Sequence, residues 1–161
     1  MDSTNNKNDS EWSTYVDHSY DGENDHDQDL FIERDGVLFA GTHLILDCWG
    51  AKNLTDIKHI EKALRKAVEV TGSTLLHIHL HHFTPNGGIS GVAVLAESHI
   101  SIHTWPERDY AALDIFMCGK TKPKKAIGIF EEAFETENIE VIEHQRGVVD
   151  GAVKNTAKTG L

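Results

Sequence analysis

The middle of the chain is built from short apolar segments that alternate with polar residues and follow one another with almost no intervening sequence. Residues 74–83, 89–105 and 110–118 show the period of two that is typical of strands, although residues 89–105 form either one continued strand or a bent one. The turn residues 85–88 and 106–109 leave room only for tight connections. Because parallel strands need a crossover of about a dozen residues or more, these strands are expected to pair antiparallel.

Two other segments have helical spacing. Residues 53–70 and residues 123–137 each place their apolar side chains three and four positions apart, so that one face of each helix is apolar. Thr55 is a suitable N-cap for the first helix, and Asn53 is an alternative. Both helices are therefore expected to pack their apolar faces on a sheet.

Strands over residues 37–48 and 139–144 complete the predicted order β-α-β-β-β-α-β. Mostly antiparallel strands with two amphipathic helices are typical of a layered α+β domain. The sequence thus predicts a two-layer sandwich, with a largely antiparallel sheet and both helices on one face. The other face of the sheet then needs a partner.

Composition and charge divide the 161 residues into three parts. Residues 1–30 contain seven Asp, two Glu and one Lys, a net charge of −8 out of −11 for the chain, and have no sustained apolar pattern. We expect residues 1–30 to be a disordered, solvated acidic arm, residues 31–147 to form the domain, and residues 148–161 to be a loose tail.

The same arithmetic disfavours several classes of protein. An acidic chain is a poor binder of nucleic acid, because phosphates attract clustered Lys and Arg. No apolar run approaches the ~20 residues that span a bilayer, and the polar start does not resemble a signal peptide. Cys48 and Cys118 are too few for a disulfide framework, which favours the reducing cytoplasm. Cys48 is interpreted as a small buried apolar residue.

Histidines are concentrated in the strand predicted over residues 74–83. His77, His79 and His81 alternate along it and therefore share one face. Such a row can bind zinc, but the sequence offers neither an HExxH nor a CxxC pattern, and the strand holds no carboxylate. A polar strand face is the favoured interpretation, and no metal is expected.

The most informative stretch runs from Ser90 to Glu107 and brings Ser, His and Glu close together in the sequence. A serine hydrolase is one reading, but the serine does not lie in a G-x-S-x-G turn. Judged by spacing alone, a sheet with polar residues on its wet face is the favoured interpretation.

Longer motifs in the same region resemble the prokaryotic S-adenosylmethionine decarboxylase proenzymes. Residues 96–107 read Ala-Glu-Ser-His-Ile-Ser-Ile-His-Thr-Trp-Pro-Glu and resemble the processing segment of that family. The likeness continues through residues 110–119, through His-Phe-Thr-Pro at 82–85, and through Glu-His-Gln-Arg-Gly at 143–147. It spans roughly residues 36–147, so it is far more specific than a short pattern.

The resemblance implies that the chain cuts itself between Glu97 and Ser98. The Ser98 hydroxyl attacks the preceding carbonyl, and elimination then releases residues 1–97 and leaves a pyruvoyl group on residues 98–161. Ser90 matches the family's oxyanion donor, and His103 matches the base that takes the Cα proton. Since Ser98 and His103 are five residues apart on extended chain, a bend or bulge is expected to bring them together.

For the mature enzyme, the resemblance implies a Schiff base between the pyruvoyl group at Ser98 and the substrate amine, with no external cofactor. Cys118 matches the proton donor in catalysis, and Glu107 matches a carboxylate that binds the ribose. Phe39 aligns loosely with an aromatic residue that stacks on adenine, and Phe83 is a second candidate. The residues alone also fit ordinary core positions for Cys118 and both phenylalanines, and a turn position for Glu107.

The implied reaction is the decarboxylation of S-adenosylmethionine for spermidine synthesis, by a cytoplasmic homodimer of cleaved protomers. Two alternatives stay open: the same machinery acting on arginine or ornithine, and, remotely, a non-catalytic His-rich metal-binding module. Asp109 stands at a turn position where relatives often have Gly, and it adds negative charge near Glu107. Asp tolerates such turn geometry.

Overall fold

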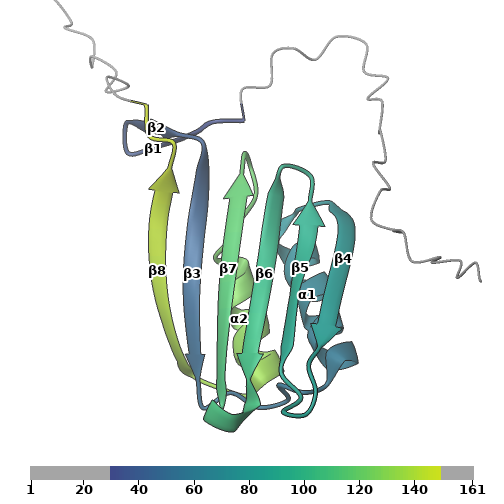
Figure 1. Cartoon of the computed structure of the whole chain (residues 1–161). Coiled ribbons are helices and arrows are strands. Elements are labelled where there is room, and N and C mark those ends of the chain that lie inside the picture. The colour runs from purple at the N-terminus through teal and green to yellow at the C-terminus, as the bar shows by residue number, and fades with distance from the viewer. Residues whose placement is uncertain (1–29, 150–161) are drawn as a thin grey trace, which may run out of the picture.

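The computed structural model describes residues 30–149, and Figure 1 shows their arrangement as one sheet with both helices on the same side. The elements in chain order are β1 (Ile32–Arg34), β2 (Val37–Phe39), β3 (Gly41–Trp49), α1 (Ile57–Thr71), β4 (Leu75–His82), β5 (Ile89–Leu95), β6 (Ser98–Trp105), the 3₁₀ turn η1 (Pro106–Arg108), β7 (Tyr110–Cys118), α2 (Lys125–Phe134) and β8 (Asn138–Arg146).

The main sheet has six strands in the order β4-β5-β6-β7-β3-β8, and every neighbouring pair is antiparallel. Helices α1 and α2 cover one face and leave the other bare (Figure 1). The predicted α+β sandwich is thus confirmed. Within residues 30–149, no helix is long and apolar enough to cross a membrane.

The core lies between the sheet and the two helices, where alternate residues of the central strands meet the apolar helix faces. The largest fully buried side chains there are Leu44, Leu46, Ile60, Leu64, Ile100, Ile102, Leu113, Phe130 and Phe134. Each strand sends every second side chain into this layer, so the intervening residues all lie on the bare face.

Helix α1 begins later than predicted, and the predicted caps are wrong. The cap is Asp56, whose carboxylate accepts from the amides of Lys58 and His59 at 3.0 and 3.1 Å. Asn53 instead adopts a left-handed backbone (φ 60°) in the preceding turn and donates its side-chain amide to Ala133 O. The helix ends at a left-handed Gly72, as its sequence predicts.

Residues 89–105 form a hairpin, so the prediction of one continued or bent strand is wrong. The chain reverses through the two-residue loop Ala96-Glu97, which pairs Leu95 with Ser98. Glu97 has a positive φ of 59°, a left-handed conformation that is uncommon for a residue other than Gly. Asp109 likewise has φ 48°, which agrees with Asp occupying a turn position suited to Gly.

The small hairpin β1–β2 was not predicted, and it lies against one end of the main sheet (Figure 1). Arg34 pairs with Glu143 of β8 and donates to Thr42 Oγ1 at 3.0 Å. Leu30 O accepts the amide of Gly119, directly after β7, at 3.1 Å. The hairpin therefore rests beside the carboxyl end of β7. The predicted arm and tail lie outside the described residues, except for residues 30, 148 and 149.

Candidate active site

The bare face of the sheet carries a dense set of titratable and polar side chains. Strand alternation and the continuous register place the following on it: His43, Asp47, His77, His79, His81, Ser90, His99, Ser101, His103, Asp114 and Cys118. The helix-covered face holds apolar residues with a few hydroxyl groups. Any chemistry that needs acids and bases therefore belongs to the bare face and its edges.

One end of this face brings the predicted cleavage site beside Cys118. Ser98 is the first residue of β6, is only 8% exposed, and its Oγ accepts the Cys118 amide at 3.3 Å. The left-handed Glu97 precedes it in the loop. Burial, reinforced by the negative charge of Glu97, raises the pKa of the Cys118 thiol, which therefore keeps its proton at neutral pH.

Ser90 and His103 meet toward the opposite end of the face. They are register partners on β5 and β6, and Ser90 Oγ lies 2.8 Å from His103 Nδ1. The His103 ring is tilted against Trp105 with centroids 6.1 Å apart. The two residues to which the resemblance assigns the helper roles in processing are thus in direct contact.

The structure does not bring Ser98 and His103 of one chain together. Strand β6 pairs with β7 without a register shift from His99 to Trp105, so the expected bend or bulge is absent from this part of the chain. Five strand residues span about 16 Å. An odd separation also turns the two side chains to opposite faces. The two pairs, Ser98 with Cys118 and Ser90 with His103, are therefore separate within a protomer.

Of the three predicted substrate-binding residues, two lie at the end that holds His103 and one is buried. Glu107 is exposed in η1, directly after β6, and Phe83 is 46% exposed with its ring 4.6 Å from that of His81. Both belong to the end that holds His103. Phe39 has 0% exposure and lies under the Arg34 guanidinium at 5.3 Å, so its ring offers no free face.

A hydrogen-bonded group beside Cys118 was missed at the level of sequence. Arg146 lies 3.1 Å from Nδ1 of His43, and Nε2 of His43 lies 3.1 Å from Asp114. Because a guanidinium can only donate, Nδ1 accepts and Nε2 carries the proton that Asp114 binds. Ser101 donates to the other Asp114 oxygen at 3.2 Å. The alternation along each strand can be read from the sequence, but the strand order that brings these residues together cannot.

His99, which follows Ser98, extends this group. Its ring stacks on Phe116 at 5.7 Å and meets His43 edge-on at 6.5 Å. Burial and then the neighbouring His43 lower the pKa of His99, which favours its neutral form. An uncharged aromatic wall thus stands beside the Ser98 end.

Stacked aromatic rings mark the end that holds His103. Tyr110 lies between Trp49 and Trp105, with centroids 4.4 and 5.2 Å apart. Its hydroxyl donates to Asp47, and burial together with this bond raises the pKa of Tyr110 to about 12. The phenol is therefore a fixed donor and not an acid at physiological pH.

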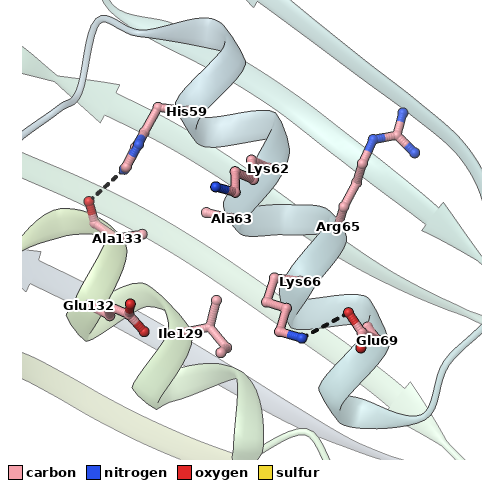
Figure 2. Close-up of a pocket in the computed structure, with 9 residues that line it drawn as sticks. All are labelled: His59, Lys62, Ala63, Arg65, Lys66, Glu69, Ile129, Glu132 and Ala133. Carbon is pink, nitrogen blue, oxygen red and sulfur yellow. Dashed lines mark hydrogen bonds and ion pairs between the residues drawn. The ribbon is translucent and has the colours of Figure 1, made fainter.

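The helix side carries a groove of about 520 Å³ between α1 and α2, and none of the predicted site residues line it (Figure 2). Among residues 30–149, no group of three His, Cys, Asp or Glu side chains is arranged to hold a metal ion, the row on β4 included. The candidate active site is therefore the bare face, divided into two ends.

Comparisons with known proteins agree with this geometry. Residues 42–147 match the family model described as S-adenosylmethionine decarboxylase. The chain is 43% identical over 110 residues to an S-adenosylmethionine decarboxylase proenzyme of Thermomicrobium roseum, covering 68% of this chain and 95% of that protein. It is 48% identical over 118 residues to the proenzyme of the same name from Methanococcus maripaludis, covering 71% and 96%.

A solved structure is similar as well. The crystal structure of the adenosylmethionine decarboxylase from Aquifex aeolicus superposes with a TM-score of 0.63 and 31% identity, covering 70% of this chain and 95% of that one. The matched region contains the main sheet, both helices and both ends of the bare face. This chain therefore belongs to the S-adenosylmethionine decarboxylase family.

Proposed function

We propose that the chain is a self-cleaving proenzyme that decarboxylates S-adenosylmethionine. The observation that carries the proposal is the state of the Glu97–Ser98 peptide. It lies in a two-residue loop with a left-handed Glu97, and the Ser98 hydroxyl is held by the Cys118 amide at 3.3 Å. Strained backbone of this kind clusters at functional sites, and here it coincides with the bond at which the sequence resemblance implies cleavage.

Processing needs only groups of the protein and one water. The Ser98 Oγ bonds to the Glu97 carbonyl carbon as the C–N bond breaks, and the hydroxyl proton passes to the amine. Removal of the Ser98 Cα proton then expels the Glu97 carboxylate from Cβ. The resulting enamine becomes an imine, and water hydrolyses it to the pyruvoyl carbonyl with release of ammonia.

The contact between Ser90 and His103 suits both helper roles in one tautomer. If Nδ1–H of His103 donates to Ser90 Oγ, Nε2 is left with a free lone pair for the Cα proton. The same arrangement leaves the Ser90 hydroxyl proton free to donate to an oxyanion. The opposite tautomer occupies Nε2 with a proton and removes the base.

We further propose that the base acts across a dimer, because Ser98 and His103 of one chain are about 16 Å apart on opposite faces. Two bare faces can pack with a twofold axis in their plane, at right angles to β6 and close to Ser101. This symmetry sets the Ser98 end of each protomer opposite His103 of the other. Val94 and Ile142, 40% and 52% exposed on the bare face, give such a contact apolar surface.

In the mature enzyme, the pyruvoyl carbonyl supplies the electron sink for decarboxylation, so no external cofactor is proposed. Cys118 then holds a proton at Sγ for the substrate carbon, a role supported by the raised pKa of its thiol. The exposed Phe83 ring suits an adenine or sulfonium group, and the exposed Glu107 carboxylate suits ribose hydroxyls.

The aromatic and carboxylate pair favours a nucleoside substrate over arginine or ornithine, which have no purine or ribose. Decarboxylated S-adenosylmethionine is the aminopropyl donor for spermidine, so the proposed place of the protein is polyamine synthesis. Cys48 and Cys118 are both free, in keeping with a cytoplasmic enzyme.

Intact mass spectrometry of the purified protein, followed by a carbon dioxide release assay, tests the proposal. The expected masses correspond to residues 1–97 and to residues 98–161 with a pyruvoyl start. Release of carbon dioxide is expected from S-adenosylmethionine and not from arginine or ornithine. An intact single chain would refute self-processing, and release from a basic amino acid alone would refute the substrate.

A further inference from the structure

The groove between α1 and α2 has an apolar floor on the surface remote from the bare face. Ala63, Ile129 and Ala133 form part of its lining, and the volume is about 520 Å³ (Figure 2). Nothing in the proposed chemistry uses this surface. An apolar strip of this size between two exposed helices is suited to an extended segment with some aromatic side chains.

The rim of the groove carries three cationic and two acidic side chains. Lys62, Arg65 and Lys66 line it from successive turns of α1, and Arg65 is paired with Glu61 at 2.6 Å. Glu69 and Glu132 also line it, but Glu69 is already paired with Lys66 at 3.0 Å. Lys62 makes no ion pair with any residue in the described range 30–149.

A run of four lysines continues the cationic surface toward the start of the described chain. Lys120, Lys122, Lys124 and Lys125 are all exposed, and only Lys124 has an ion-pair partner among residues 30–149, namely Glu143. The amide of Lys122 binds the carbonyl of Thr71 at the end of α1, at 2.9 Å. This lysine segment therefore connects with the helix that bears the cationic side chains of the rim.

The acidic arm enters the domain at the lysine segment. The carbonyl of Leu30 accepts the amide of Gly119, the residue before Lys120, at 3.1 Å. Residues 1–29 carry a net charge of −8 and include Trp12, Tyr15 and Tyr20. Twenty-nine extended residues can span up to about 95 Å, far more than the length of a short helix.

We propose that residues 1–29 bind intramolecularly along the lysine segment and into the groove between α1 and α2. Aspartates next to Leu30 pair with the lysines beside Gly119, and the aromatic residues farther along the arm cover the apolar floor. Each exposed ion pair contributes little. The covalent tether, however, gives the arm an effective concentration on the order of millimolar, so weak pairs act together. The binding is expected to weaken with salt.

Carbodiimide cross-linking of the full-length protein tests the proposal, because it joins carboxylates to amines only in direct contact. Protein uniformly labelled with ¹⁵N is mixed with unlabelled protein, and cross-linked peptides are identified by mass spectrometry. The expected links join arm carboxylates to Lys62, Lys66 and the lysine segment within one protomer, so that both linked peptides carry the same isotope. Their yield should fall severalfold in 0.5 M sodium chloride.

Charge reversal provides the matched control. Lys62→Glu should lower the yield of links to Lys66, the groove amine that remains, severalfold. Lys58→Glu makes the same change of charge outside the groove and should leave the links to Lys62 and Lys66 unchanged. Intact mass verifies self-processing of every variant. Links spread evenly over all exposed lysines, links found only between labelled and unlabelled protomers, or links restricted to the lysine segment would each overturn the proposal.

Discussion

The two faces of the main sheet are built from the same strands yet have opposite character. The helix-covered face holds Leu, Ile and Ala side chains that are almost entirely shielded from water. The bare face holds imidazoles, carboxylates and stacked indoles on the intervening residues. The covered face supplies the free energy of folding, so the bare face is free to carry groups that would be costly in a core.

Ser98 is the exception that links the two. Its side chain has the covered-face parity of β6, while Cys118, whose amide it binds, belongs to the bare face. The cleavage bond therefore lies at the edge where the two environments meet. The contrast predicts that mutations on the bare face alter the chemistry, and that mutations on the helix-covered face alter the free energy of unfolding.

The largest effect is expected for Ser98→Ala. Without the hydroxyl no acyl shift can begin, so the chain should remain whole and inactive. Intact mass spectrometry after prolonged incubation measures the uncut fraction. Appearance of the 98–161 chain in this variant would place the attacking group elsewhere.

His103→Ala tests whether the imidazole of one protomer acts as the base at Ser98 of the other protomer. Removal of the base should slow processing by a factor on the order of 10² or more and leave an ester that hydroxylamine cleaves. Mixing it with Ser98→Ala during refolding should restore cleavage in the His103→Ala chains, because the second chain supplies an intact imidazole.

An unchanged rate in the His103→Ala variant alone would show that another group is the base. Failure of the mixture, with dimers present by sedimentation, would show that the base acts within its own chain. A protein that sediments as a monomer at micromolar concentration, with full activity, would contradict the dimer itself.

Cys118→Ser separates use of the cofactor from its formation. Processing should be retained, while turnover falls by a factor on the order of 10² because serine is a far weaker acid than a thiol. Misplaced protonation should gradually leave alanine in place of pyruvoyl at the start of residues 98–161. Mass spectrometry of that chain during turnover measures the conversion of pyruvoyl to alanine. An unchanged turnover rate with an intact pyruvoyl group would show that Cys118 serves only packing.

The pH dependence of the wild type sharpens the same assignment. Because burial and Glu97 raise the pKa of the thiol, Cys118 stays protonated at neutral pH and loses its proton only above the ordinary thiol value of ~8.5. The kcat profile should therefore decline on the alkaline side. The decline should be missing in Cys118→Ser.

Paired truncations compare the two faces directly. Phe130→Ala, in helix α2 and buried in the core against the covered face, should lower the free energy of unfolding by about 3–5 kcal/mol. Ile142→Ala, from the bare face, removes a side chain that is 52% exposed in the protomer and should mainly weaken dimerisation. Urea titration and sedimentation at several concentrations distinguish the two effects. Equal losses in the free energy of unfolding of the protomer would contradict the predicted difference between the two faces.

The smallest effect is expected from deletion of residues 2–29. The proposed binding of this arm lies on the helix side, so self-cleavage and kcat should change less than twofold. Time courses of cleavage and a carbon dioxide release assay measure both. A soluble deletion variant that fails to cleave would show that the arm serves the bare face.

Sequence periodicity is sufficient to predict the sheet layer and the helix layer, because apolar spacing shows which side chains face the core. It failed at connections. The β5–β6 turn uses Ala96-Glu97, which lacks the Gly or Asn that usually marks a tight hairpin. The β1–β2 turn does carry such a signal, Asp35-Gly36 with φ 55° and 78°, so that hairpin is encoded in the local sequence.

The candidate site was only partly predictable for a related reason. The family resemblance predicts roles for Ser98, Ser90, His103 and Cys118, but not their division between two ends of the sheet. The group of Arg146, His43, Asp114 and Ser101 was invisible because β3 is inserted between β7 and β8, far from its sequence neighbours. Strand order depends on long-range packing that a local pattern does not contain.

The insertion of β3 has a consequence for the fate of the protein after it cuts itself. The proposed cleavage after residue 97 assigns β3, β4 and β5 to one polypeptide, and β6, β7 and β8 to the other. In the sheet, β3 is hydrogen-bonded to β7 and β8 on either side, while β5 pairs with β6. Strands of the two fragments therefore alternate in the sheet, and neither fragment can dissociate without breaking the hydrogen bonds between these strands. Refolding from denaturant then requires two molecules to meet, so maturation converts a unimolecular folding reaction into a bimolecular one that is slower at greater dilution.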